Sequence, residues 1–143
     1  MVDNALVIAP AGSVSSTVLP SDAEGRRAAI GELVGGGADQ GRYHPEVLLH
    51  VRGNGSPEPN LTAWALASTW RNLEISYLLY GTVVVTGPAS GAELPANVAA
   101  QVRAAGDAVT AIMDEWRSRR PISNDAAVAE LLAGVRHSLA SLP

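Results

Sequence analysis

The amino-acid sequence predicts a helix-dominant α+β fold, in which a small sheet of two to four short strands packs around a central buried helix. Three patterns indicate this class. An apolar stripe with helical spacing runs through residues 61–80, two short runs with strand character lie at 46–52 and 82–86, and two amphipathic segments follow from residue 94. At 143 residues the chain can bury one core. We therefore expect a single α+β domain over residues 21–143.

Residues 1–20 are expected to form either an extended N-terminal arm or short strands. Two apolar runs, at 5–9 and 14–19, are separated by Pro10 and Gly12. Because β-propensity mainly reports the surface on which a strand packs, both alternatives stay open. A segment with so little charge would be prone to aggregate if it were free. We expect it to be covered by its own domain or by another subunit.

The first helix is predicted to begin at Ser21, which has the spacing of a capping box with Glu24. The glycine-rich residues 35–45 follow it. A phosphate-binding loop needs a strand before it, a helix after it and a Gly-Lys-Ser/Thr ending, and this segment has none of them. We therefore predict a flexible connector. The charged side chains of the first helix are expected to point mostly outward: Glu24, Arg26, Arg27 and Glu32.

A strand is predicted at residues 46–52, because apolar and polar side chains alternate there. Val47, Leu49 and Val51 would point into the core. The opposite face gathers titratable groups, and we take it as the candidate ligand-binding or acid–base site, since histidine titrates near neutral pH. The alternative is a solvated sheet face or one covered by a partner. The candidate residues on this face are His44, Glu46, His50 and Arg52.

Two further site hypotheses concern an anion and a metal ion. The glycine-containing loop 87–91 lies between a predicted strand and a predicted helix, a geometry that can bind anions, so Ser90 is a further candidate. A plain connecting turn is the alternative. His44 and His50 lie six residues apart, which is too far along one strand for both to bind one ion. We predict no metal site.

The central stretch is predicted to be a buried helix that Asn60 caps and Gly81 ends. A competing interpretation ends the helix near Asn72 and starts a strand, because apolar residues also alternate over 73–79. Polar and charged residues within the stretch argue against a membrane span. The stripe of the helix consists of Leu66, Trp70, Leu73, Tyr77 and Tyr80.

Residues 94–142 are predicted to form an antiparallel helical hairpin, which turns at Pro121 and Ile122. Positive charge at the C-terminal end of its first helix suits the helix dipole, which explains Arg117, Arg119 and Arg120 without a nucleic-acid partner. Two apolar seams support the hairpin: Val98, Val102, Ala105, Val109, Ile112 and Trp116 in the first helix, and Val128, Leu131, Leu132, Val135, Leu139 and Leu142 in the second.

Composition narrows the function classes. The chain has no cysteine, which excludes disulfides and cysteine-ligated metals. Its net charge is −4, which disfavours nucleic acid as a main partner. All ten basic residues are arginine, a composition typical of a GC-rich bacterium or phage. Because the first twenty residues lack the pattern of a secretory signal, we expect a cytoplasmic location, or the virion for a phage protein.

No catalytic constellation is evident in the sequence, so we expect a non-enzymatic assembly or interaction protein. It would form a homo-oligomer or part of a larger protein complex, such as a phage virion or another bacterial structural component. We expect it to need no cofactor and to bind neither nucleic acid nor membranes. The alternative hypothesis is a small-molecule-binding domain or enzyme that uses His44, Glu46, His50 and Arg52.

Overall fold

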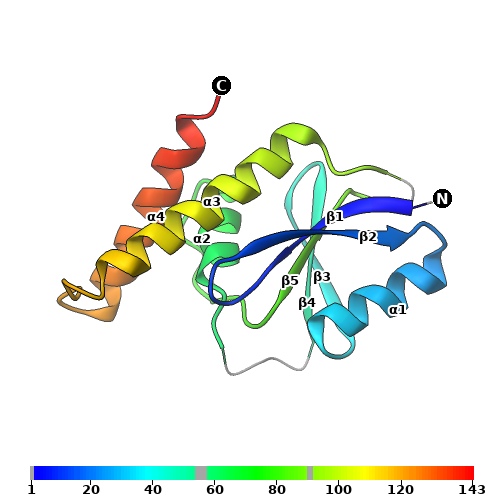
Figure 1. Cartoon of the computed structure of the whole chain (residues 1–143), viewed down its shortest axis with the longest axis horizontal. Helices are drawn as coiled ribbons and strands as arrows, with labels where there is room; N and C mark the ends of the chain where they lie inside the picture. The colour runs from blue at the N-terminus through cyan, green and yellow to red at the C-terminus, as the bar shows by residue number, and fades with distance from the viewer. Residues whose placement is uncertain (1, 54–57, 90–91) are drawn as a thin grey trace.

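The computed structural model describes residues 2–53, 58–89 and 92–143, and within them five strands form one antiparallel sheet (Figure 1). The strand order is β2-β1-β5-β4-β3. This confirms the α+β class, while the expected two to four strands is wrong. In chain order the elements are β1 Val2–Ile8, β2 Val14–Pro20, α1 Ala23–Val34, β3 Ala38–His44, β4 Val47–Arg52, α2 Leu61–Arg71, β5 Val83–Thr86, α3 Ala96–Glu115 and α4 Asn124–Ala140.

The first twenty residues form two strands of this sheet. β1 pairs with β2 on one side and with β5 on the other, so it lies inside the sheet. The turn between β1 and β2 is closed by hydrogen bonds from Ala9 N–H to Ser13 O and from Gly12 N–H to Ala9 O, both 2.9 Å. Gly12 has a φ of 103°, a conformation that favours glycine. Ala5, Leu6 and Ile8 are buried.

One strand that we did not predict is β3, which lies where we expected a flexible connector. Residues 38–44 pair with β4, with a register shift between Gly41 and His44. The prediction failed because this segment is polar, contains glycine and lacks β-branched residues, which gives it little intrinsic strand signal. An edge strand needs only one paired side and one packed face. Pairing with β4 therefore stabilises the extended conformation of β3 despite its low strand propensity.

The central helix is shorter than predicted. α2 is capped by Asn60, whose side chain accepts a hydrogen bond from Ala63 N–H, and it ends where Asn72 adopts a left-handed conformation. The helix predicted through Tyr80 is therefore wrong, and residues 73–80 form no strand beyond a single bridge between Tyr80 and Pro59. The competing interpretation placed the helix end correctly but not the strand.

Polar groups of α2 explain why residues 73–80 fold back instead of continuing the helix. The Trp64 indole N–H donates to Ile75 O at 2.9 Å, and Ile75 N–H donates to the Ser68 hydroxyl at 3.2 Å. These bonds fasten the segment against α2, with Ile75 and Leu79 buried and Tyr77 exposed. The apolar pattern reports this packing and not a helical repeat.

The helices cover the two faces of the sheet unequally (Figure 1). α2 and α3 lie on one face, and α4 packs against both of them; the three helices bury the larger core, which includes Val47 and Leu49 of β4. α1 covers the other face, where a smaller cluster gathers around Ile30. The alternation predicted for β4 is therefore correct. The smaller cluster consists of Ala5, Leu19, Ile30, Val34 and Val84.

α3 and α4 pack against each other at the C-terminal end, as the hairpin prediction expects (Figure 1). Their buried residues lie on the predicted seams, except Gly106 of α3. α3 also approaches the β1–β2 turn closely, because a Cβ atom at Gly106 would lie 2.6 Å from Val14 Cγ2 and 2.8 Å from Gly12 O. The buried seam residues are Val98, Val102, Ala105 and Val109 of α3 and Leu131, Leu132 and Val135 of α4.

Candidate functional site

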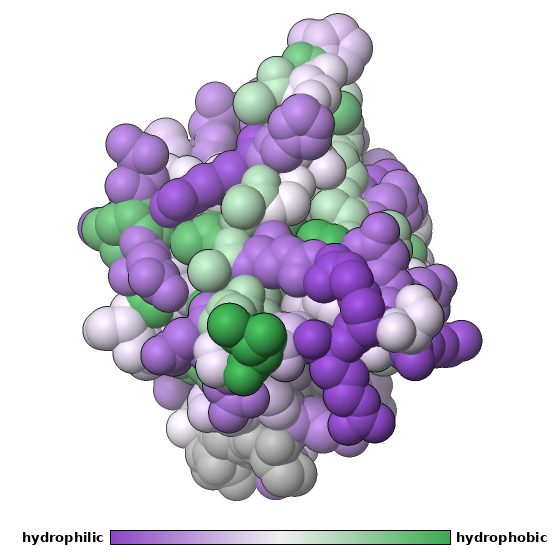
Figure 2. Space-filling view, turned by 90° about the vertical axis from the view of Figure 1, so that its left-hand side faces the viewer, coloured by the Kyte–Doolittle hydropathy of each residue, from purple (hydrophilic) through white to green (hydrophobic). Residues whose placement is uncertain are grey.

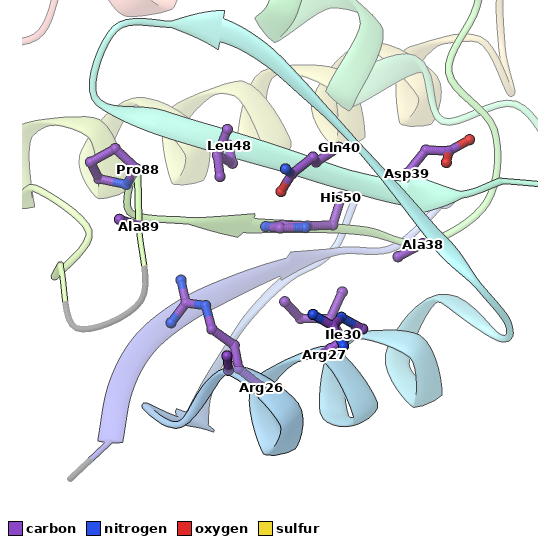
Figure 3. A pocket seen from close by; sticks show the side chains of 11 residues that line it. Arg26, Arg27, Ile30, Ala38, Asp39, Gln40, Leu48, His50, Pro88 and Ala89 are labelled. Atoms are coloured by element: carbon purple, nitrogen blue, oxygen red, sulfur yellow. The ribbon is translucent and has the colours of Figure 1, made fainter.

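A cleft of about 680 Å³ opens between α1 and the sheet face that α1 covers (Figure 3). Two polar side chains in its wall, Arg26 and His50, are each only 7% exposed. Such deeply buried polar groups are unusual in a protein of this size, so the cleft is the candidate functional site. Its lining consists of Ala23, Arg26, Arg27, Ile30, Ala38, Asp39, Gln40, Leu48, His50, Pro88 and Ala89.

His50 is directed into the cleft by the alternation of β4, which sends Leu48 and His50 to the α1 face. Its Nε2 lies 2.8 Å from the Thr86 hydroxyl, and that hydroxyl donates its own proton to Gly87 O at 3.0 Å. Because the hydroxyl has one proton, Nε2 must carry a hydrogen and donate to Thr86. The neutral ring then keeps its lone pair on Nδ1.

The His50 ring is neutral at pH 7. Its burial, together with the positive charge of Arg26, lowers the pKa of His50 from 6.5 to about 4. A general base works best with a pKa near the operating pH, so this imidazole is a weak base at neutral pH. The group is better suited to accept a hydrogen bond from a ligand than to abstract a proton.

Arg26 reaches the cleft from α1. The helix is capped by Asp22, which accepts from Gly25 N–H at 2.8 Å, and not by the predicted Ser21. Arg26 lies four residues before Ile30, and so shares its inward face. We predicted Arg26 to point outward, which is wrong. The spacing of Arg26, Ile30 and Val34 was the signal that could have placed it on the buried face.

The structure does not bring the predicted site residues together. His44 is half-buried with its ring 5.2 Å from that of Trp70 of α2, and its Nδ1 accepts from Glu46 N–H at 3.1 Å. Glu46 is exposed in the turn before β4. Arg52 shares a face of β4 with His50 but lies against Gly36. Ser90 lies outside the described residues.

Sequence analysis therefore found His50 but missed the groups that surround it. Arg26, Gln40 and Thr86 come from three other elements, α1, β3 and β5. Thr86 had been predicted only as the end of a buried strand. Among the described residues, no three histidine or acidic side chains are placed to hold a metal ion.

The arginine cluster at the end of α3 is paired with carboxylates. Arg119 lies in hydrogen-bond contact with Glu115 and Glu130, and the contact with Glu130 raises the pKa of Arg119 and lowers that of Glu130. Arg117 lies 3.5 Å from Asp114. Figure 2 shows this end of the molecule, where hydrophilic side chains surround isolated hydrophobic ones. The charges of Arg117 and Arg119 thus belong to local ion pairs.

Comparison with protein-family models, curated proteins and solved structures finds no match to the chain. The geometry of its own residues therefore carries the functional argument. Within the described residues, none of the helices is long and apolar enough to cross a membrane.

Proposed function

We propose that this protein is a non-enzymatic assembly protein that forms a homodimer through the outer edge of β2. The chemistry of this edge is the observation that carries the proposal. β2 ends the sheet, and in the described part of the chain no strand pairs with its outer side. An edge strand presents backbone N–H and C=O groups on which another strand can pair.

β2 has few of the features that usually protect an edge strand: a proline, Pro20, stands at its end, but it contains no charged residue and no bulge. Its residues carry no charge, and its register with β1 is continuous from the pair of Val2 with Pro20 to the pair of Ile8 with Val14. Val18 is 55% exposed, and Ser15 and Ser16 are exposed as well. A strand without a bulge or a charged residue, and with an exposed apolar side chain, is a favourable template for pairing.

The opposite edge of the sheet differs. β3 carries Asp39 and Arg42, and its register shifts between Gly41 and His44. Edge charges and bulges both discourage a strand from pairing with another chain. The two edges therefore favour a closed dimer through β2, with the protected β3 edges at its two ends, over an open chain of copies.

A two-fold axis at Thr17 gives the longest antiparallel overlap of β2 with a second β2. In this register Thr17 faces itself and Ser16 faces Val18 of the second copy, so no like charges oppose each other. Opposed threonines are a favourable cross-strand pair. The assembled sheet would run continuously through both copies.

Light scattering after size exclusion tests the proposal. We expect the wild-type protein to have twice the 14.7 kDa mass of one chain. Val18→Lys should shift the protein to monomer, because it places two charges beside the shared edge. Ile122→Lys is the matched control, since Ile122 is 96% exposed on the α3–α4 turn and the change should leave the dimer intact. A wild-type monomer at every concentration would refute the proposal.

Cysteine cross-linking tests the register. Because the sequence has no native cysteine, any disulfide must form between the introduced residues. Thr17→Cys should form an intermolecular disulfide rapidly under mild oxidation, because the two Cβ atoms face each other. Ser15→Cys is the control: its counterpart would lie four residues away along the strands, roughly 13 Å, which is beyond disulfide reach. Equal rates for the two variants would exclude this register.

A further inference from the structure

We infer that the cleft between α1 and the sheet binds a small organic carboxylate that carries a hydrogen-bond donor beside its acid group. The inference rests on the cleft itself and is independent of the proposed assembly function. Three properties of the lining define the ligand: buried positive charge, a lone-pair acceptor, and apolar side chains beside them (Figure 3).

The positive charge selects an acid. Arg26 and Arg27 both line the cleft, and Figure 3 shows the guanidinium of Arg26 extending toward Pro88 and Ala89. A guanidinium has five N–H donors in a planar fork, so it can bind a carboxylate while also keeping a partner within the protein. Burial strengthens this contact, because water competes less for the charge.

The acceptor selects a donor on the ligand. His50 Nε2 donates to Thr86, which leaves Nδ1 as the remaining polar atom of the ring. Among the described residues, no hydrogen bond reaches Nδ1. Because the ring is neutral at pH 7, with a pKa near 4, it can accept from a hydroxyl or amine of the ligand. A second carboxylate in the same place would have no proton to offer.

The remaining lining limits the size and polarity of the ligand. Ile30, Leu48, Pro88 and Ala89 supply apolar contact, and Gln40 offers an amide next to His50 (Figure 3). Asp39 is the acidic residue of the lining, and its carboxylate lies beside Gly53. The volume of about 680 Å³ lies within the range of roughly 300–1,000 Å³ found for small-molecule sites. A hydroxy or amino acid with a modest apolar side chain matches all three properties.

Glycolate and acetate are matched probes, because both are achiral and they differ only in the hydroxyl group. We would titrate each into ¹⁵N-labelled protein at pH 7 and follow the imidazole nitrogens, assigning His50 with a His50→Gln variant. Glycolate should shift the Nδ1 resonance of His50 saturably, with a millimolar Kd. The Kd of acetate should be about fivefold higher, because acetate lacks the hydroxyl that donates one hydrogen bond to Nδ1.

Variants locate the binding in the cleft. Arg26→Gln should weaken glycolate binding about tenfold or more, because it removes the charge-assisted contact. Ala38→Trp fills the cleft from β3 without removing a polar group and should abolish the shifts, even if Arg26→Gln fails to fold. The matched control is Ala111→Trp on exposed α3, outside the cleft, which should bind glycolate as the wild type does.

Three results would overturn the inference. Linear, unsaturable shifts up to tens of millimolar would mean that no site exists. Equal binding of glycolate and acetate would remove the role of the Nδ1 acceptor. Saturable binding that persists in Ala38→Trp would place the ligand outside the cleft.

Discussion

On one face of the sheet, α2, α3 and α4 bury a continuous apolar core that includes Trp64 and Leu66. On the other face, α1 lies alone over a small cluster around Ile30 and leaves a cleft beside it. The same strands supply both faces. Val47 and Leu49 of β4 enter the large core, and Leu48 and His50 point to the cleft.

The difference indicates that one face of the sheet can provide stability while the other provides a binding cleft. Three helices exclude water from the first face, so that face determines stability. A single helix on the second face cannot cover every strand, and polar groups that reach the uncovered part remain accessible to a ligand. Stability and recognition are therefore expected to respond to different substitutions, as measured at fixed protein concentration because association adds to apparent stability.

The largest difference between the faces should come from truncating one side chain on each. Trp64→Ala should lower the free energy of unfolding by roughly 3–5 kcal/mol, since it removes the largest buried side chain of the core. Leu48→Ala on the cleft face should cost only about 1 kcal/mol, because Leu48 is half-buried. Urea denaturation measures both. Equal costs would mean that the cleft face contributes as much to stability as the core.

The second comparison concerns the N-caps of α2 and α1, which should contribute unequally to the free energy of unfolding. Asn60 is fully buried, and its side-chain amide also donates to Ile8 O at 3.0 Å and Gly81 O at 2.8 Å. Asn60→Ala should lower the free energy of unfolding by about 3 kcal/mol, because two buried carbonyls are left without their donor. Asp22→Ala, at the exposed cap of α1, should lose about 1 kcal/mol in the same denaturation experiment. A smaller loss at Asn60 than at Asp22 would contradict the comparison.

The third prediction concerns the pH dependence of stability and belongs to the cleft face alone. Because burial lowers the pKa of His50 from 6.5 to about 4, the unfolded chain takes up a proton at a higher pH than the folded one. Stability should therefore fall as the pH drops from 6.5 toward 4, by roughly 2–3 kcal/mol from this residue.

Denaturation from pH 7 to 4 measures this loss. His50→Gln should remove that part of the slope, while His137→Gln, on the exposed side of α4, should leave it unchanged. If the free energy of unfolding changed with pH equally in the wild type and in His50→Gln, the conclusion that His50 is buried in its neutral form would be wrong.

Elements whose residues carry their own periodicity could be predicted from the sequence. β4 alternates, β5 is a run of buried valines, and α3 and α4 have regular apolar seams. β3 and residues 73–80 could not be predicted, because their conformation depends on partners distant in sequence. β3 is a strand because β4 lies beside it, and residues 73–80 are fixed by Trp64 and Ser68 of α2.

The candidate site was only partly predictable for the same reason. The alternation of β4 correctly directed His50 away from the core. It could not show that His44 would contact Trp70, or that Arg26 would approach from another element. A cleft is defined by distances between elements, and those distances follow from topology.

The side chain of Asn60 also has a consequence for how the molecule opens. It links the start of α2 to β1, 52 residues away, and to Gly81, 21 residues away and two residues before β5. Detachment of either segment from α2 would break its bond to Asn60 and leave a buried carbonyl without its donor. We therefore expect the three segments to open together, so that their amide protons exchange with solvent at similar rates. The cap of α1 is local and exposed, and we expect the amide protons of α1 to exchange faster than those of this unit.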